Sequence, residues 1–206
     1  DSEQLYQSII ASPIIIDSES KGSIVLERKN DTSFSSIDLK NLELIGQVLG
    51  SALHWRYEYE KIHMNATHDG LSGLLNHQTF KERFRDEIQR AARFQQKMAI
   101  MIFDLDKFKN VNDTLGHQYG DYVIQTVAKI MIDNVRAVDV VARYGGEEFS
   151  MVLPETDGEG AVIVADRCRQ VIEETPFDAN GVPLNITMSV GVSTFYPKRE
   201  NATIER

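Results

Sequence analysis

The chain has 206 residues, of which 42% are apolar and 26% are charged, a composition typical of a folded globular protein. Asp and Glu outnumber Lys and Arg by 31 to 22, and the resulting net charge of -9 argues against binding to nucleic acid or to an acidic membrane surface. No apolar run approaches the roughly 18 residues of a membrane span. The single cysteine, Cys168, fits a reducing cytoplasm. The start at Asp1, without a methionine, indicates a piece of a longer protein.

Two short strands and one long helix are predicted in the first third of the chain. The strands cover residues 13–17 and 22–27 and are joined by a polar turn at 18–21. Ser35 and Asp38 offer N-cap chemistry for a helix that extends to about residue 68. Apolar residues recur along this helix at alternating spacings of three and four, and they form a heptad stripe made of Ile45, Val48, Ala52, Trp55, Tyr59, Ile62 and Ala66.

A second apolar face, formed by Leu42, Leu49 and Leu53, lies beside the heptad stripe. A helix with two apolar faces can pack on its own domain with one face and on a partner chain with the other. The alternative is a single broad stripe that is buried within one monomer.

The glycines in Asp69–Leu74 end this helix and mark a domain boundary. The apolar run at 98–105 is typical of a strand covered on both faces, and Ser189–Gly191 is interpreted as part of a buried strand. Strands and helices alternate from this boundary onward, which predicts an α/β (α+β) domain with helices packed on a central sheet. Helices are predicted at 78–95, 106–115, 118–135 and 158–174, and strands at 98–105, 140–144, 149–153 and 184–195.

Four acidic residues occupy positions where a metal site can form. Asp104 and Asp106 end the apolar strand, and open α/β sheets bind ligands at that edge. Glu147 and Glu148 follow two glycines at the tip of a predicted hairpin, where a ligand can approach the backbone closely. A hard cation such as Mg²⁺ would relieve the repulsion between such carboxylates. Acidic residues at strand ends and turns are otherwise solvated surface, so spacing alone leaves both interpretations open.

Three blocks at consistent spacing, within residues 66–196, resemble the GGDEF family of diguanylate cyclases. They are Asp69–Asn76, with Ser72 in place of the usual threonine, Phe103–Asp121 and Arg143–Phe149. The resemblance implies a bacterial, cytoplasmic enzyme with a fold like that of nucleotidyl cyclases and polymerase palms, in which helices flank a central, mainly antiparallel sheet.

The resemblance also implies the metal site and the reaction. Asp104 and Glu147 match the carboxylate ligands, and the carbonyl of Leu105 matches a backbone ligand. They would hold Mg²⁺ or Mn²⁺, about two ions in each half-site. The 3′-hydroxyl of one GTP would attack the α-phosphate of another and expel pyrophosphate, twice, to give cyclic di-GMP. Glu147 and Lys109 are the expected catalytic residues.

The resemblance to the GGDEF family also implies which residues bind the substrate. Asn112 and Asp121 match the residues that read guanine, and an aspartate can accept from the N1–H and N2–H₂ groups that adenine lacks. The backbone amides of Lys107, Phe108 and Lys109, at a helix start, would cradle the phosphates. Each monomer would bind one GTP, so the resemblance implies a homodimer formed through the helix at 36–68.

Arg136 and Asp139 form an R-x-x-D sequence, which on its own is a common ion pair at a helix end. At this distance from the hairpin it matches the family's inhibitory site for cyclic di-GMP, and Arg167 matches a supporting arginine. Arg143 and Asp69 are expected to form a structural ion pair between the opening turn and the hairpin.

The first residues resemble, more loosely, the last two strands and closing helix of a GAF sensory domain. The expected organisation is a partial GAF-like domain at 1–35, a signalling helix at 36–68 and a GGDEF catalytic domain at 69–206. The sequence stops before the lysine-bearing C-terminal helix of the family, so the catalytic domain would lack it. The alternatives to an active cyclase are an inactive module that binds cyclic di-GMP and a structural dimerisation fragment. No contact with nucleic acid or membrane is expected.

Overall fold

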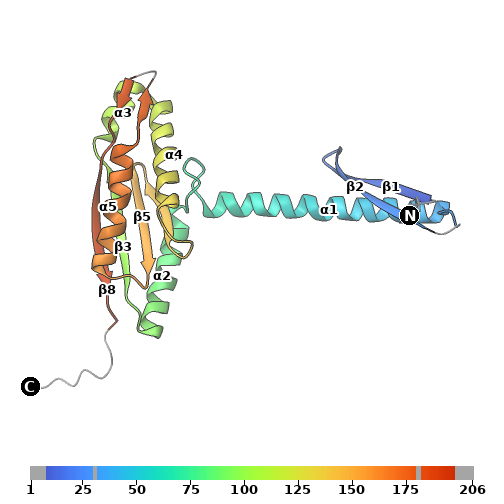
Figure 1. Cartoon of the computed structure of the whole chain (residues 1–206), viewed down its shortest axis with the longest axis horizontal. Coiled ribbons are helices and arrows are strands. Elements are labelled where there is room, and N and C mark those ends of the chain that lie inside the picture. The colour runs from blue at the N-terminus through green and yellow to red at the C-terminus, as the bar shows by residue number, and fades with distance from the viewer. Residues whose placement is uncertain (1–7, 30–31, 180–181, 198–206) are drawn as a thin grey trace, which may run out of the picture. The chain divides into compact units, whose positions relative to one another are not determined.

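A computed structural model describes residues 8–29, 32–179 and 182–197 of the chain. The chain divides into two compact units, residues 1–64 and residues 65–206. The helices and strands, labelled in Figure 1, are β1 (Ser8–Ile16), β2 (Glu19–Arg28), α1 (Ser36–Thr67), α2 (His77–Phe94), β3 (Met98–Leu105), α3 (Phe108–Leu115), α4 (His117–Asp133), β4 (Val140–Gly145), β5 (Glu148–Pro154), α5 (Gly158–Glu174), β6 (Phe177–Ala179), β7 (Val182–Leu184) and β8 (Met188–Phe195).

The N-terminal unit contains the predicted hairpin, with longer strands and a tighter turn than expected. β1 and β2 pair antiparallel, and only Asp17 and Ser18 connect them. Both residues have positive φ angles, 50° and 66°, which suit the twist of a two-residue hairpin turn. The turn was predicted at 18–21, but it begins one residue earlier, at Asp17. The short polar side chain of Asp17 tolerates the left-handed conformation that the turn requires.

α1 begins with a reciprocal cap. The carboxylate of Asp38 accepts hydrogen bonds from the backbone N–H and the hydroxyl of Ser35, at 2.7 and 2.8 Å, and the Ser35 hydroxyl accepts from the Asp38 N–H at 3.2 Å. These bonds use donors that a helix start otherwise leaves unpaired. They also hold the pKa of Asp38 below its usual range. The predicted N-terminus of the long helix is therefore confirmed.

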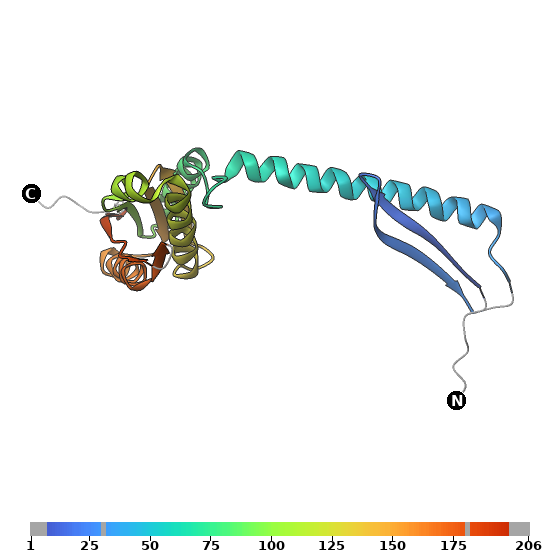
Figure 2. The ribbon, with the colours of Figure 1, turned by 90° about the horizontal axis from the view of Figure 1, so that it is seen from above.

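The hairpin lies along the first half of α1 (Figure 2). Two glycines of the helix lie beneath it. A Cβ atom at Gly50 would overlap the carbonyl oxygen of Ile15, and one at Gly46 would come within 2.8 Å of the carbonyl oxygen of Pro13. The strand can approach the helix this closely only because both positions lack side chains.

The heptad stripe occupies a part of α1 that the hairpin does not cover. Its large members are 50 to 73% exposed, namely Ile45, Val48, Trp55, Tyr59 and Ile62. In heptad terms the hairpin-covered glycines fall at b and f positions, on the outer side of an a/d seam. The alternative prediction, that the stripe is buried within one monomer, is therefore wrong for the described residues.

The prediction that a second apolar face of α1 packs on its own domain is only partly correct. Leu42 is buried, but Leu49 and Leu53 remain exposed. The reason is that the hairpin packs along the line of Gly46 and Gly50 rather than along the line of leucines.

The C-terminal unit is built on a four-stranded antiparallel sheet in the order β4-β5-β3-β8. On one face, Met101 and Phe103 of β3 are fully buried in a core shared with α4 and α5. On the other face, Phe80 and Ala91 of α2 pack against Val152 and neighbouring residues of the sheet. The predicted fold class, a mainly antiparallel sheet flanked by helices, is confirmed.

Two details of this sheet differ from the prediction. β3 is not covered along both faces, because Ile102 is 48% exposed where α2 does not reach. On the adjoining strand Ser189 and Gly191 are also exposed, so the interpretation of Ser189–Gly191 as buried is wrong. The predicted strand at 184–195 is divided, since β7 ends at Leu184 and pairs with β6, and β8 begins at Met188.

No helix in the described ranges is both long and apolar enough to cross a lipid bilayer.

Candidate active site

The end of β3 and the tip of the β4–β5 hairpin meet at one edge of the sheet. Asp104 lies opposite Glu148 in the β3–β5 register, and the N–H of Leu105 donates to the carbonyl oxygen of Glu147 at 3.3 Å. Gly146 forms the turn with a φ of 26°, a conformation that residues with side chains rarely adopt. The structure therefore brings Asp104, Leu105 and Glu147 together.

The carboxylates at this edge are available to a ligand. Asp104 and Glu148 are exposed and Glu147 is half-buried, and none of the three side chains makes a hydrogen bond or ion pair with the described residues. No group of three or more His, Cys, Asp or Glu side chains in the described ranges is arranged to hold a metal ion by itself. Unpaired carboxylates and nearby carbonyls fit Mg²⁺, which takes a few protein oxygens and leaves other positions to phosphate and water.

Glu148 was among the four acidic residues expected where a metal site can form, but the family resemblance gave it no role of its own. Its Cα is the direct partner of Asp104, so the two side chains leave the same face of the sheet. This pairing depends on the register between β3 and β5, which are not consecutive strands, so no local sequence pattern indicates it.

The two aspartates at the end of β3 have different surroundings. Asp106 accepts hydrogen bonds from the hydroxyls of Thr187 and Ser189, both at 2.7 Å, and its N–H donates to the Thr187 carbonyl at 3.0 Å. The two hydroxyl bonds hold the pKa of Asp106 below its usual range. Asp104 has no such partners. The structure thus directs Asp106 toward β8 and leaves Asp104 for a ligand.

The predicted phosphate-binding segment is the start of α3. Lys107 precedes the helix in the left-handed conformation, with φ 57° and ψ 25°, and no side chain caps the helix. The N–H groups of Phe108 and Lys109, in the first turn, have no intrahelical acceptor, and the helix dipole adds partial positive charge there. A cleft of about 800 Å³ adjoins this segment, lined by Asp104, Asp106, Lys107, Asn110, Val111, Thr114, Leu115, Leu184, Asn185, Ile186 and Thr187.

The predicted guanine-reading residues come together where α3 meets α4. Gly116 ends one helix and begins the next, and Asp121 lies in the second turn of α4. A Cβ atom at Gly120 would overlap the side-chain oxygen of Asn112 and come within 3.2 Å of the Phe108 ring. The Asn112 amide therefore lies over Gly120, directly before Asp121. Neither Asn112 nor Asp121 lines the 800 Å³ cleft.

The predicted ion pair between Arg143 and Asp69 is confirmed. Arg143 Nη1 donates to Asp69 Oδ1 at 3.0 Å, and Nε and Nη2 both donate to the Gly146 carbonyl, at 3.0 and 2.7 Å. Burial alone would raise the pKa of Asp69, but hydrogen bonds from Ser72 and the guanidinium of Arg143 outweigh it and lower the pKa. One arginine thus ties the opening turn to the turn of the β4–β5 hairpin.

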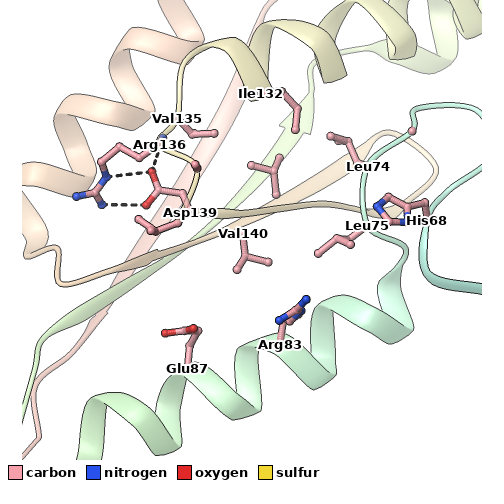
Figure 3. Close-up of a pocket in the computed structure, with 14 residues that line it drawn as sticks. His68, Leu74, Leu75, Arg83, Glu87, Ile132, Val135, Arg136, Asp139 and Val140 are labelled. Carbon is pink, nitrogen blue, oxygen red and sulfur yellow. Dashed lines mark hydrogen bonds and ion pairs between the residues drawn. The ribbon is translucent and has the colours of Figure 1, made fainter. Parts of the chain in front are cut away.

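The R-x-x-D residues lie just before β4, at the opposite end of that strand from Gly145. Figure 3 shows Arg136 and Asp139 facing one another beside a pocket of about 400 Å³ that α2 also lines through Arg83 and Glu87. Arg136 Nη2 donates to Asp139 at 2.9 Å and also to Thr156, at 2.9 Å. Only 2% of the Asp139 side chain is exposed.

Arg167 reaches the same turn from α5. Its Nη2 donates to the carbonyl oxygen of Asn134, two residues before Arg136. The three residues of the predicted inhibitory site are therefore grouped, but Arg136 and Asp139 are bonded to each other rather than held open.

Known proteins are similar to the part of the chain that holds these motifs. The family described as "Diguanylate cyclase, GGDEF domain" matches residues 66–205. The chain is 43% identical over 108 residues to diguanylate cyclase A of Treponema denticola and 39% identical over 128 residues to diguanylate cyclase DosC of Escherichia coli K12. These matches cover 52% and 62% of this chain, but 29% and 28% of those relatives.

A solved structure supports the same assignment. The coiled coil and GGDEF domain of DgcB from Caulobacter crescentus, in complex with c-di-GMP, matches with a TM-score of 0.68 and 25% identity. The match covers 79% of this chain and 85% of that chain. Because the family match spans more than half of the 206 residues and includes all three motif blocks, the chain belongs to the GGDEF-domain family of diguanylate cyclases.

Proposed function

We propose that this protein condenses two GTP molecules into cyclic di-GMP and two pyrophosphates. The observation that carries the proposal is that Asp104 and Glu147 lie at one edge of the sheet. Their carboxylates make no hydrogen bond or ion pair with the described residues. The start of α3 and the Asn112–Asp121 pair supply, beside that edge, sites for phosphates and for a base. Membership of the family and the names of its relatives agree with this activity.

The residues of the chain would bind and orient the substrate. Asp104, the carbonyl of Leu105 and Glu147 would hold Mg²⁺ or Mn²⁺, about two ions in each half-site. Such ions, when bound, lower the pKa of an attacking hydroxyl and neutralise charge that develops on the α-phosphate. The amides at 107–109 would hold the other phosphates, with Lys109 adding a charge, and Glu147 would help to remove the proton from the 3′-hydroxyl.

Specificity for guanine would come from the pair formed by Asn112 and Asp121. A carboxylate accepts from two neighbouring donors, and guanine presents N1–H and N2–H₂ side by side where adenine does not. A carboxylate that a bound base covers without offering it a donor costs about 1–3 kcal/mol, which disfavours ATP.

We further propose that the protein acts as a homodimer through α1. The reaction needs two GTP molecules face to face, and each domain offers one set of binding residues. The exposed heptad stripe supports this arrangement, because large apolar residues at a and d positions are expected to pack on another helix. The solved DgcB relative also contains a coiled coil.

The remaining proposals concern regulation and location. We propose that Arg136, Asp139 and Arg167 bind cyclic di-GMP as an inhibitor, supported by their grouping at one turn and by the c-di-GMP in the DgcB structure. We propose that residues 1–35 are part of a GAF-like sensory domain in front of a signalling helix at 36–68 and a catalytic domain from residue 69. The unpaired, buried Cys168 supports a cytoplasmic location.

The second candidate function is a catalytically inactive module that binds cyclic di-GMP. The bonded Arg136–Asp139 pair beside a pocket is the observation that favours it. The test is incubation of the full-length protein with GTP and Mg²⁺, with mass spectrometry of the products. Cyclic di-GMP is expected, whereas binding of added cyclic di-GMP without any synthesis would support the inactive module.

A further inference from the structure

Asp106 is anchored at the predicted catalytic edge by both of its carboxylate oxygens. Each of its carboxylate oxygens accepts a hydroxyl hydrogen bond at 2.7 Å, one from Thr187 and one from Ser189. The adjacent backbone adds a third bond, from the Asp106 N–H to the Thr187 carbonyl at 3.0 Å. All three bonds join the end of β3 to the start of β8, across 81 to 83 residues of chain.

The residue that follows Asp106 needs such an anchor. Lys107 has a φ of 57°, and left-handed conformations of residues other than glycine persist only when the surrounding structure holds them. α3 starts directly afterwards without a side-chain cap. The direction of the first N–H groups of α3 therefore depends on what fixes the backbone just before the helix.

We propose that Asp106 is a positioning residue for the phosphates of the nucleotide, acting through Thr187 and Ser189 rather than through the metal. The latch, defined as these three side chains, holds Lys107 in its left-handed conformation and so sets the direction of the N–H groups of Phe108 and Lys109, which bind phosphates in the proposed function. Asp106, Lys107 and Thr187 all line that cleft of about 800 Å³. The inference rests on the proposed function, since it assigns the latch to GTP binding.

The competing role for Asp106 is direct metal coordination, which its place two residues after Asp104 would suggest. The hydroxyl partners separate the two roles. Replacing Thr187 by Val removes one latch hydroxyl and keeps both the side-chain shape and the Asp106 carboxylate. If Asp106 were a metal ligand, the loss would appear in the metal concentration that gives half-maximal turnover, whereas the loss of a latch would appear in the binding of the nucleotide.

The test uses the full-length protein and measures both turnover and binding. The binding probe is 3′-deoxy-GTP with Mg²⁺, which carries the base and phosphates but lacks the hydroxyl that the proposed reaction needs. For Thr187→Val combined with Ser189→Ala, we expect the KM for GTP and the Kd for 3′-deoxy-GTP to rise about tenfold, since two hydrogen bonds to a charged group are lost. We expect kcat to change less than about twofold, because binding is lost equally in the ground and transition states.

Two controls accompany these variants. Thr187→Ser keeps the hydroxyl and is expected to bind 3′-deoxy-GTP as the wild type does. Ser193→Ala removes an exposed hydroxyl from the same strand and the same face as Ser189, and it is expected to leave binding unchanged. The metal concentration that gives half-maximal turnover is expected to stay constant in all variants.

A double-mutant cycle decides whether the latch acts as one unit. If Asp106 works through Thr187, adding Thr187→Val to Asp106→Ala weakens binding no further. Wild-type binding by the Thr187→Val/Ser189→Ala protein, or additive losses in the cycle, would overturn the inference while leaving the proposed function intact. A wild-type protein that binds no 3′-deoxy-GTP would instead contradict the proposed function and the inference with it.

Discussion

The two units of this chain bury their apolar residues in different ways. In the C-terminal unit, both faces of the sheet carry packed side chains, with a large core under α4 and α5 and a smaller one under α2. In the N-terminal unit, the hairpin covers one line of α1, where Leu42, Gly46 and Gly50 are the buried residues of the helix. The large apolar residues of the heptad stripe remain exposed.

This difference separates a unit that completes its own core from one that is expected to need a partner. Large exposed apolar residues in a regular row mark interaction sites in soluble proteins. The proposed reaction also requires a partner. One pair of Asn112 and Asp121 would hold one guanine, and the reaction joins two GTP molecules. The comparison therefore predicts that core substitutions matter most in the C-terminal unit, and that substitutions on the stripe act through association.

The largest expected effect is on the stability of the C-terminal unit. Phe103 is fully buried in the core of the sheet, so Phe103→Ala is expected to lower the free energy of unfolding by about 3–5 kcal/mol through lost burial and an unfilled cavity. Chemical denaturation followed by circular dichroism measures this. Phe94→Ala is the matched control, because Phe94 is mostly exposed at the end of α2, and it is expected to cost less than about 1 kcal/mol.

The second prediction concerns the heptad stripe. Val48→Asp with Ile62→Asp places charges at two d positions, so the proposed dimer is expected to dissociate and turnover to fall about tenfold or more at low protein concentration. Sedimentation velocity and activity as a function of protein concentration measure both effects.

The matched control for the stripe is Tyr57→Asp, at an exposed f position of the same helix. It is expected to leave association unchanged. If the stripe variant and the wild type both sediment as monomers and both have full activity, association through α1 is not needed for turnover.

A smaller effect is expected at the contact between α3 and α4. Gly120→Ala would push the Asn112 amide away from its place beside Asp121, so the KM for GTP is expected to rise about tenfold while the thermal midpoint changes little. Steady-state kinetics and a melting curve test this. Gly158→Ala, also in a helix, meets only an ordinary contact with Thr194 and serves as the control. Unchanged kinetics in Gly120→Ala would show that Asn112 does not read the base.

The smallest effect is expected at the R-x-x-D turn. Arg136→Ala removes a planar group suited to guanine and phosphate, and it is expected to raise the inhibition constant of cyclic di-GMP about fivefold while leaving initial rates unchanged. Progress curves with added cyclic di-GMP measure the effect. Inhibition equal to that of the wild type would mean that Arg136 serves only its bonds to Asp139 and Thr156.

The sequence predicted most of the helices and strands because their signals are local. β3 and α5 have the predicted bounds, and the Arg143–Asp69 ion pair forms as expected. The division of the 184–195 segment was missed because three irregular residues, 185–187, interrupt an otherwise strand-like stretch. Thr187 lies between β7 and β8, and its hydroxyl donates to Asp106. No local pattern could indicate this bond, because the two residues are 81 positions apart.

The same limit applies to the candidate site. The family resemblance singled out Asp104 as a metal ligand, but the motifs could not show that Asp106 is bonded to the hydroxyls of Thr187 and Ser189. They also gave no role to Glu148, because its position opposite Asp104 depends on the register between two strands. On α1, the heptad spacing predicted the stripe, but only the contact of Ile15 with Gly50 shows where the hairpin lies.

The most direct test of the central claim is the rate of cyclic di-GMP synthesis by Glu147→Gln in the full-length protein with GTP and Mg²⁺. The variant keeps the size of the side chain and removes the charge that would hold the metal, so turnover is expected to fall at least about a thousandfold with the circular dichroism spectrum unchanged. Glu159→Gln, the same substitution in the first turn of α5, is expected to keep full activity. Normal synthesis by Glu147→Gln would contradict the proposal that Asp104 and Glu147 share a catalytic metal site.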